Sequence, residues 1–422
     1  MTAEIAVLNK NGIALAADSA VSVGSKIFNS ANKLFALTKY HPVGIMIFGN
    51  AHFMGIPWET IIKYYRQNVL KTKRFPKIDD YMRDLVDFIS TSSLFDETGE
   101  RDFVRLFVYR KLYLLVKKIK DEAAKEIRSK GKISNEDTAK IVEKYVGAWL
   151  SMHHKEKTYF PRGTRQYLER KYKVEVVGIV EEVMKDFPLP KRLLDSLPAT
   201  LLDCFGRQRS TLSPSGIVIA GFGDDQVFPA VSAIRVDGKI RQHVRIVAHE
   251  VDNVDHENSA AIMPFAQREM VDLFMNGTDP GLHSEIMKVV GETLGDIDQR
   301  IVKCASLNLD QTVRDAIKEE MKKAETELRK RFQHKQITEF IHPVLRGVAS
   351  LPLDELAAMA ESLVNLTSFK RRVTHVPESV GGPVDVAVIS KGDGFIWIKR
   401  KHYFSPELNP HFFRQFAVKE QS

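Results

Sequence analysis

Residues 2–18 read TAEIAVLNKNGIALAAD, and this stretch decides the fold. Two apolar runs of β type, Ile5–Leu8 and Ile13–Ala17, are joined through Asn11-Gly12. Asn-Gly between such runs is a strong hairpin signal, because a type I′ turn needs positive φ at both central residues. We therefore predict a hairpin that folds at residues 11 and 12 and returns Asp18 toward Thr2.

Four residues near this hairpin form a candidate site for acyl transfer. The small side chain of Thr2 permits removal of Met1, which leaves an α-amine and a hydroxyl on one residue, a nucleophile with its own base. The Lys33 ammonium, held by Asp18, would disfavour protonation of that amine. The apolar run 43–49 ends at Gly49, whose backbone N–H could point at a developing oxyanion.

The segments TAEIAV (2–7), NGIALAADS (11–19), NKLF (32–35) and IFGNA (47–51) resemble proteasome β-subunits and the bacterial peptidase HslV. The resemblance implies an α+β fold, namely a four-layer αββα amino-terminal-nucleophile hydrolase sandwich. It also implies a threonine peptidase that hydrolyses peptide bonds. Thr2 would be the nucleophile, Asp18 and Lys33 the charge pair that tunes it, and Gly49 the oxyanion donor. Ile47 would line the pocket for the substrate side chain.

Later segments also resemble the family, and among them residues 380–389 are similar to its Ser-Gly-Gly segment, which a buried strand follows. Residues 217–222 and 228–240 are similar to its second sheet, and Asp237-Gly238 predicts a further hairpin there. The run Pro264-Phe265-Ala266-Gln267 is similar to the start of a family helix, and we predict an amphipathic helix over Met263–Met275.

The supporting residues of the family site are replaced in this chain. Its serine falls on Ala261, with Ser259 as the nearest substitute. The Asp and Ser expected near the end of the chain fall on Pro377 and Val380, with Glu378 and Ser379 as substitutes. These replacements keep a second hypothesis open, a catalytically inactive scaffold on the same fold.

The resemblance divides the chain into core and helical insertions. The predicted parts are core 1–70, insertion 71–209, core 210–280, insertion 281–350 and core 351–422. Within them we expect a helix starting near Pro57 and a long apolar helix stripe from Val104 to Ile127. We also expect a helix capped by Asp310, whose apolar stripe is core or an interface with another helix, and a helix over Leu356–Leu366 capped by Asp354.

The first insertion is strongly basic, which supports a third hypothesis, binding of nucleic acid or another acidic partner. One helix face would carry Arg105, Arg110, Lys111, Lys117, Lys118 and Lys120. Basic residues between 155 and 173 are interleaved with Tyr159, Phe160, Tyr167 and Tyr172, as in surfaces that stack bases. A solvated helix surface explains the same pattern more simply, and no nucleic-acid module is recognised. We therefore rank nucleic acid as an unlikely partner.

Composition fits a globular protein of 422 residues with 44% hydrophobic and 27% charged residues and a net charge of +8. We see no secretory leader and no apolar run of membrane-spanning length, so we expect a cytoplasmic protein that has no membrane partner.

Cys204 and Cys304 are expected to be two buried thiols. The cluster of His and acidic residues at 249–257 lacks the spacing of a metal motif and is expected to be a strand-end loop, so we assign no metal and no cofactor. The family implies peptide or unfolded-protein substrates and a homo-oligomer, and leaves open an unfolding ATPase as partner.

Overall fold

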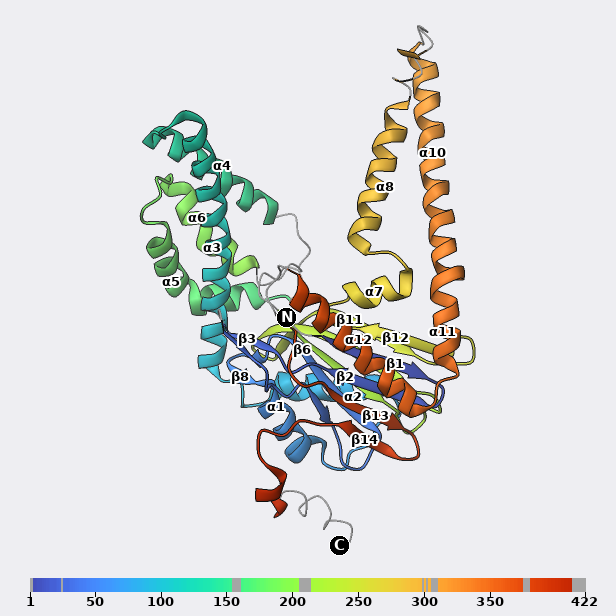
Figure 1. Cartoon of the computed structure of the whole chain (residues 1–422). Helices are drawn as coiled ribbons and strands as arrows, with labels where there is room; N and C mark the ends of the chain where they lie inside the picture. Colours follow the sequence, from blue (N-terminus) through green and yellow to red (C-terminus); the bar gives the residue numbers. More distant parts are fainter. Residues whose placement is uncertain are drawn as a thin grey trace.

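The computed structural model describes residues 3–23, 26–153, 161–204, 214–297, 300, 303–304, 310–374 and 380–411. Two five-stranded antiparallel sheets pack face to face at its centre (Figure 1). The first sheet has the order β12 (Ala260–Pro264), β1 (Glu4–Asn9), β2 (Gly12–Ala17), β13 (Asp385–Ser390) and β14 (Gly394–Lys399). The second has the order β11 (His243–Asn253), β10 (Ala230–Ile240), β9 (Ser215–Gly221), β6 (Val43–Gly49) and β5 (Leu34–Ala36). Helices and sheets together confirm the predicted α+β class.

Alternating residues of β1 explain how this sheet is buried on both faces. Ala6 and Leu8 belong to the core between the sheets, together with Met46 of the second sheet. Ile5 and Val7 point to the opposite face, because neighbouring side chains of a strand alternate. There they pack with residues of α11 (His342–Ala349) and α12 (Leu353–Val373). On the far side of the second sheet lie α1 (Trp58–Tyr64) and α2 (Ile78–Thr91).

The first hairpin is confirmed, but its turn differs from the prediction. Asn9 pairs with Gly12, so the turn residues are Lys10 and Asn11, and none of the three residues 10–12 has a positive φ. The prediction of a type I′ turn was therefore wrong. The Asn9 side chain forms the turn instead, because its Oδ1 accepts from Asn11 N at 2.9 Å while its Nδ2 donates to Leu351 O at 2.8 Å. Such local side-chain hydrogen bonds compete with standard turns.

The second predicted hairpin turn, Asp237-Gly238, was also wrong. Both residues lie within β10, where the register with β11 shifts, and the chain turns later at Arg241, whose φ is +53°. This bulge leaves the Asp237 carboxylate buried against Arg245, with Oδ2 2.6 Å from Nη2. A bulge commonly re-aims a side chain in this way.

Two helix starts required correction, and two others are confirmed. Met263 lies in β12, because residues 260–264 pair with β1, and α7 begins only at Glu269 (Glu269–Asn276). The last long helix starts at Leu353 after Pro352, so Asp354 is in its first turn and is not its cap. Pro57 does precede α1, and Asp310 does cap α10 (Gln311–Lys335) by accepting from Val313 N at 2.9 Å.

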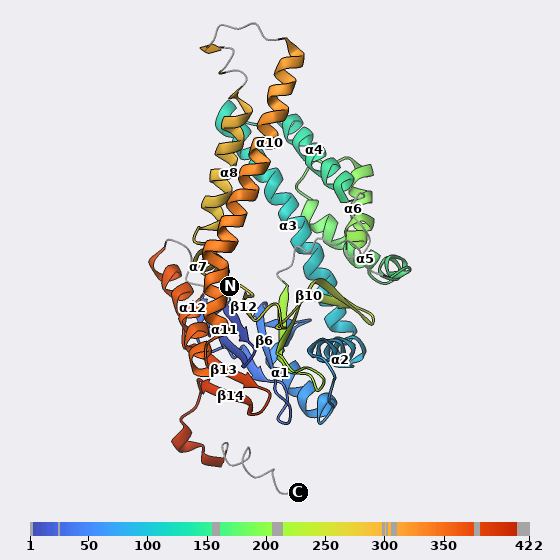
Figure 2. The same ribbon diagram turned by 90° about the vertical axis from the view of Figure 1, so that its right-hand side faces the viewer.

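Two helical arms project from the same side of the sandwich (Figures 1 and 2). The first consists of α3 (Glu97–Lys130), α4 (Asn135–His153), α5 (Thr164–Met184) and α6 (Lys191–Cys204). It has its own core, which includes the predicted stripe residues Val104, Val108, Leu112, Leu115 and Ile119. Lys111 was wrongly placed on the exposed face, since it is buried with its ammonium 5.4 Å from the centre of the Phe107 ring.

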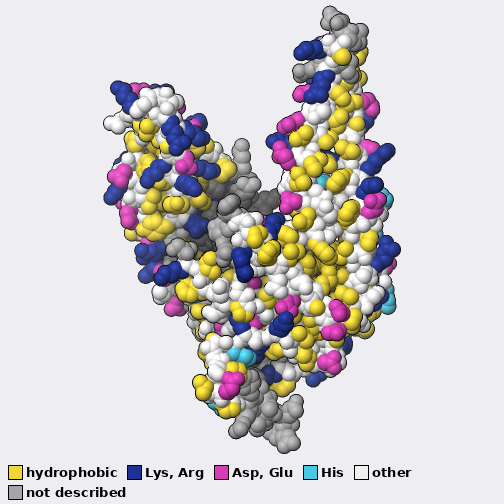
Figure 3. Space-filling model, viewed as in Figure 1, with side chains coloured by type: hydrophobic (Ala, Val, Ile, Leu, Met, Phe, Trp, Pro, Cys, Tyr) yellow, Lys and Arg dark blue, Asp and Glu magenta, His cyan; other side chains and the backbone are white. Residues whose placement is uncertain are grey.

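The second arm contains α7, α8 (Pro280–Gly295), α10, the π-helix η2 (Gln336–Ile341) and α11. Helices α8 and α10 lie side by side, with the His283 and Phe332 rings 4.7 Å apart, as expected for a stripe that packs on another helix. In the space-filling view, hydrophobic side chains gather along this arm and a hollow separates it from the first (Figure 3).

The cysteine prediction is half right, since Cys204 is buried and Cys304 is exposed. Across the ranges described above, no helix is both long and apolar enough to cross a bilayer.

The first arm is tied to the second sheet through the buried carboxylate of Glu100. Its Oε1 accepts from the hydroxyls of Tyr167 and Tyr172, both at 2.6 Å, and its Oε2 accepts from Arg241 N at 2.7 Å. Burial disfavours the charged form, yet these hydrogen bonds and the nearby Lys171 ammonium hold the pKa of Glu100 below its ordinary value.

We expect Glu100→Gln to lower the free energy of unfolding by about 1–3 kcal/mol at neutral pH, because the amide cannot accept all three hydrogen bonds. A depressed carboxyl pKa stabilises the fold above the unfolded-state pKa, and this contribution is lost as the pH falls through the folded-state pKa. The difference between wild type and variant should therefore shrink on acidification below about pH 4.5. Urea unfolding across that range measures it, and a difference that does not change with pH would contradict this role for Glu100.

Candidate active site

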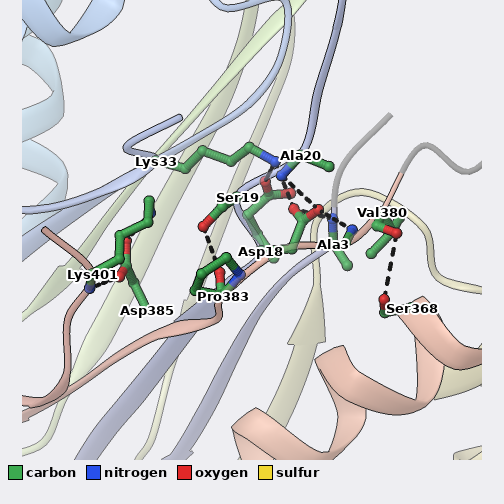
Figure 4. A network of polar contacts seen from close by, with 12 residues as sticks. Ala3, Asp18, Ser19, Ala20, Lys33, Ser368, Val380, Pro383, Asp385 and Lys401 are labelled. Carbon is green, nitrogen blue, oxygen red and sulfur yellow. Dashed lines mark hydrogen bonds and ion pairs between the residues drawn. The ribbon is translucent and has the colours of Figure 1, made fainter. Parts of the chain in front are cut away.

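The site begins where the first hairpin returns to the amino-terminal end of β1. Ala17 pairs with Glu4, so Asp18 lies beside Ala3. Asp18 N donates to Ala3 O at 3.1 Å, and Ala3 N donates to Asp18 Oδ1 at 3.0 Å (Figure 4). The hairpin pairing therefore positions the Asp18 carboxylate at the first residue that the structure describes. Thr2 itself lies outside the described residues.

Lys33 reaches the same carboxylate from the second sheet. Its Nζ is 2.6 Å from Asp18 Oδ1, and the two side chains are 5% and 0% exposed. Lys33 O accepts from Ile47 N at 2.8 Å, which places Lys33 beside β6, immediately before the first residue of β5. The structure thus brings together Asp18 and Lys33 as a buried ion pair between the sheets, at the edge where β1 starts (Figure 4).

The other oxygen of Asp18 is held by backbone donors. Oδ2 accepts from Ala20 N at 3.2 Å and from Gly381 N at 3.0 Å. Gly381 belongs to the late segment for which the family resemblance implied supporting residues. Two of those candidates, Glu378 and Ser379, lie outside the described residues, as does Pro377. With donors from three chain segments and Lys33, Asp18 has a fixed orientation.

Glu4 is a residue of this site that the sequence reasoning missed. Its Oε1 lies 3.7 Å from Lys33 Nζ, and its side chain is fully buried. The available signal was a carboxylate within an otherwise apolar strand, because charged side chains are almost never fully buried unless they are paired. Two carboxylates thus face one ammonium.

Gly49 and Ile47 lie at the end of β6, next to Lys33. These three residues line one pocket of about 120 Å³, together with Val21, Ala31, Asn32, Phe48, Asn50, Ala51, His52, Pro57, Trp58 and Glu59. Ile47 is 5% exposed and Gly49 has a φ of +78°. A methyl group on Gly49 would lie 2.3 Å from Pro214 O. Both the positive φ and this close backbone approach require glycine at position 49.

Ser259 does not lie at the site. It precedes Ala260, which pairs with Asn9 at the far end of β1, and Ala261 pairs with Leu8. Six residues of strand separate Ala3 from Asn9, a span of about 20 Å. Ser259 therefore cannot contact the Asp18–Lys33 pair, and Ala261, opposite Leu8, also lies toward the far end of β1 from this pair. The correction follows from the pairing of β12 with β1, which the motif alone did not reveal.

The cluster at 249–257 is partly in a strand, contrary to the predicted loop. His249 lies in β11, and its Nε2 is 2.9 Å from Asp79 Oδ1 and 3.3 Å from Ser232 Oγ. Ser232 Oγ also donates to Asp79 Oδ1, at 2.8 Å. This is not a catalytic triad, because serine and carboxylate meet the same ring nitrogen. The described part of the chain contains no group of three His, Cys, Asp or Glu side chains arranged to hold a metal ion.

The aromatic residues of the basic insertion do not form an exposed stacking surface where they are described. Tyr172 is 1% exposed, and both it and Tyr167 donate to Glu100. Lys171 lies 3.2 Å from Glu97, and Arg165 Nε lies 2.9 Å from Glu169. Lys155, Lys157, Tyr159 and Phe160 lie outside the described residues. The described contacts therefore give no observation in favour of nucleic-acid binding.

No family model matches the chain, and no curated protein matches it. Several solved structures are similar. One is a helical assembly of the Anbu complex from Pseudomonas aeruginosa, at 10% identity over 98% of this chain and 92% of that one, with a TM-score of 0.33. Another is an Anbu mutant from Hyphomicrobium sp. strain MC1, at 9% identity over 100% and 99% of the two chains, with a TM-score of 0.29. A third is Anbu, described as an ancestral beta-subunit, from Yersinia bercovieri, at 7% identity over 98% and 94%, with a TM-score of 0.26.

Proposed function

We propose that this protein is a threonine peptidase of the amino-terminal-nucleophile type, built on a four-layer αββα sandwich with helical insertions. The observation that carries the proposal is the buried Asp18–Lys33 ion pair, in which Lys33 Nζ lies 2.6 Å from Asp18 Oδ1. The same oxygen accepts from the backbone N–H of Ala3, the residue that follows Thr2. A charge pair buried at a chain end is costly to maintain, and such sites are enriched in catalytic groups. The proposed layering is supported by three successive cores. One lies between the helices and β1–β2, one between the two facing sheets, and one between β9–β10 and the helices beyond them.

In the proposed mechanism, removal of Met1 frees the Thr2 amine, and Thr2 Oγ attacks a peptide carbonyl. The amine takes the hydroxyl proton, directly or through a water molecule, and later delivers it to the leaving amine. Ala3 N is bonded to Asp18 Oδ1, and this contact would fix the peptide group that joins residues 2 and 3. Water then hydrolyses the ester and releases Thr2.

Lys33, Gly49 and Ile47 have separate proposed roles around the nucleophile. Lys33 favours the base form of the amine, while Asp18 and Glu4 hold the lysine in place. Gly49 N–H stabilises the oxyanion. Ile47 forms part of the apolar wall of the pocket, which suits an uncharged substrate side chain.

Access to the site suggests the kind of substrate. The β7–β8 hairpin (His52–Phe53 and Ile56–Pro57) borders the pocket and meets the start of α3 near Gly99. On the other side, Phe265 N donates to Glu4 O shortly before α7 begins. The site therefore lies between the bases of the two arms. We propose an extended or unfolded polypeptide as substrate and the arms as contacts within a homo-oligomer.

The decisive experiment is labelling of the purified chain with an epoxyketone or β-lactone, read by intact mass. We expect a chain without Met1 that gains one probe per molecule at Thr2. Thr2→Ala should lose the adduct, and Thr138→Ala, a threonine on arm helix α4, should keep it. If Met1 is retained, or if Thr2→Ala is still labelled, the peptidase proposal is wrong and the scaffold reading replaces it.

A further inference from the structure

A second and larger cavity lies along the open edge between the two sheets, beside the edge strands β5 and β14. Its volume is about 970 Å³, near the upper end of the range for small-molecule sites. Residues from three segments line it, namely 32–42, 59–67 and 385–403. It shares Asn32 and Glu59 with the pocket at Gly49 but contains none of the proposed catalytic residues.

The acidic side chains that line this cavity already have partners. Glu59 Oε1 lies 2.6 Å from Lys63 Nζ, and Asp385 pairs with Lys401. Asp393 Oδ2 accepts from Ser390 Oγ at 2.6 Å. The carboxylates are therefore committed to contacts other than the two lining arginines.

Those arginines, Arg66 and Arg400, form no ion pair with a carboxylate anywhere in the described chain. Arg66 Nη1 donates to the backbone oxygen of Ala36 at 3.1 Å, and the Arg400 guanidinium lies 4.8 Å from the centre of the Trp397 ring. Partial loss of solvent lowers the pKa of both groups, and the charge of Arg400 lowers that of Arg66 further. Asp385 and Glu59 oppose the effect on Arg400 without cancelling it.

Two like charges that share a cavity favour an anion between them. Guanidinium groups bind phosphate and carboxylate through paired hydrogen bonds, and such charge-assisted bonds are about twice as strong as neutral ones. Aromatic rings lie at the same cavity, including Trp397, Tyr40 and Tyr403, of which the last two are 60% and 89% exposed. Exposed rings offer a stacking surface for a flat ligand.

We propose that this cavity binds a small organic anion, with a phosphate or carboxylate held by Arg66 and Arg400 and a flat ring on the neighbouring aromatic side chains. This site is independent of the proposed peptidase chemistry, so its test requires no cleavage assay.

Isothermal titration of the full chain at low salt with adenosine monophosphate, benzoate and uncharged adenosine tests the proposal. At least one of the two anions should bind, and adenosine should bind at least about tenfold more weakly than adenosine monophosphate if the phosphate is recognised. Binding of adenosine monophosphate without benzoate assigns a phosphate site, and the reverse assigns a carboxylate site.

Variants identify the binding groups. Arg66→Gln and Arg400→Gln should each weaken binding by about tenfold or more, whereas Arg331→Gln, on the exposed face of α10, should leave it unchanged. Since Arg66 also bonds to Ala36 O, Arg400→Gln serves as the test if the first variant does not fold. Failure of both anions to bind, or binding that is unchanged in Arg400→Gln, overturns the proposal.

Discussion

Replacing Lys33 by methionine is expected to lower the free energy of unfolding by about 3–5 kcal/mol and to slow acylation by about 100-fold or more. Methionine keeps an unbranched apolar stem of similar length, so the variant removes chiefly the ammonium. Asp18 and Glu4 then remain as buried carboxylates without this cation. Removing one partner of a buried ion pair is far more costly than the loss of an exposed ion pair.

Lys399→Met is the matched control for stability. Lys399 Nζ also lies 2.7 Å from a carboxylate, that of Glu361, but its side chain is 57% exposed. Its removal should cost at most about 1 kcal/mol. Urea unfolding gives the stability, and the rate of probe attachment by intact mass gives the chemistry. Measuring that rate only under conditions where circular dichroism shows the variant folded separates the two effects. A folded Lys33→Met chain that is labelled at the wild-type rate would show that Lys33 acts in stability alone.

The Glu4 carboxylate changes how the role of Lys33 is understood. Glu4 adds a second carboxylate, 3.7 Å from the ammonium that Asp18 already contacts at 2.6 Å. A carboxylate raises the affinity of a nearby amine for its proton, so this second carboxylate opposes the local effect of the ammonium. The proposed general base therefore depends on Lys33 lying closer to the Thr2 nitrogen than either carboxylate does, and a crystal structure of the processed chain would measure these distances.

The sequence predicted those parts of the site that follow from local pairing. Once Ile5–Leu8 and Ile13–Ala17 form a hairpin, Asp18 must return to the start of the chain, and this held although the turn type was wrong. The turn type could not be predicted, because the Asn9 side chain bonds to Leu351, which is remote in the sequence. The partner of Glu4 could not be predicted for the same reason, because Lys33 lies on a remote segment, although a carboxylate in an apolar strand does indicate a buried partner.

The predictions that were wrong concern residues whose position depends on the pairing register between strands that are distant in the sequence. Ser259 was chosen as the neighbour of a motif position, yet the pairing of β12 with β1 places it at the wrong end of the strand. Asp237-Gly238 has the composition of a turn, but the bulge uses Asp237 to satisfy the buried Arg245. In each case a tertiary contact outweighed a local preference.

Gly49→Ala is expected to cost substantially more stability than Gly55→Ala, although both glycines have a similar φ, +78° and +83°. The positive φ alone costs an alanine about 1–2 kcal/mol, and this term is common to both variants. The difference is steric, because a Cβ on Gly49 would lie 2.3 Å from Pro214 O, whereas a Cβ on Gly55 meets no atom within 4 Å. We therefore expect Gly49→Ala to exceed Gly55→Ala by about 2 kcal/mol or more in urea unfolding, since overpacking against backbone forces the main chain to move.

That movement is also what should affect catalysis. The backbone of Gly49 lies at the pocket shared with Lys33, and loss of one oxyanion donor typically slows reaction by about 100- to 1,000-fold. Folded Gly49→Ala should therefore be labelled by the probe far more slowly than Gly55→Ala, which should match the wild type. Equal unfolding costs for the two variants would mean that β6 and Pro214 separate easily. Equal labelling rates would remove Gly49 from the proposed oxyanion site even if the nucleophile at Thr2 is correct.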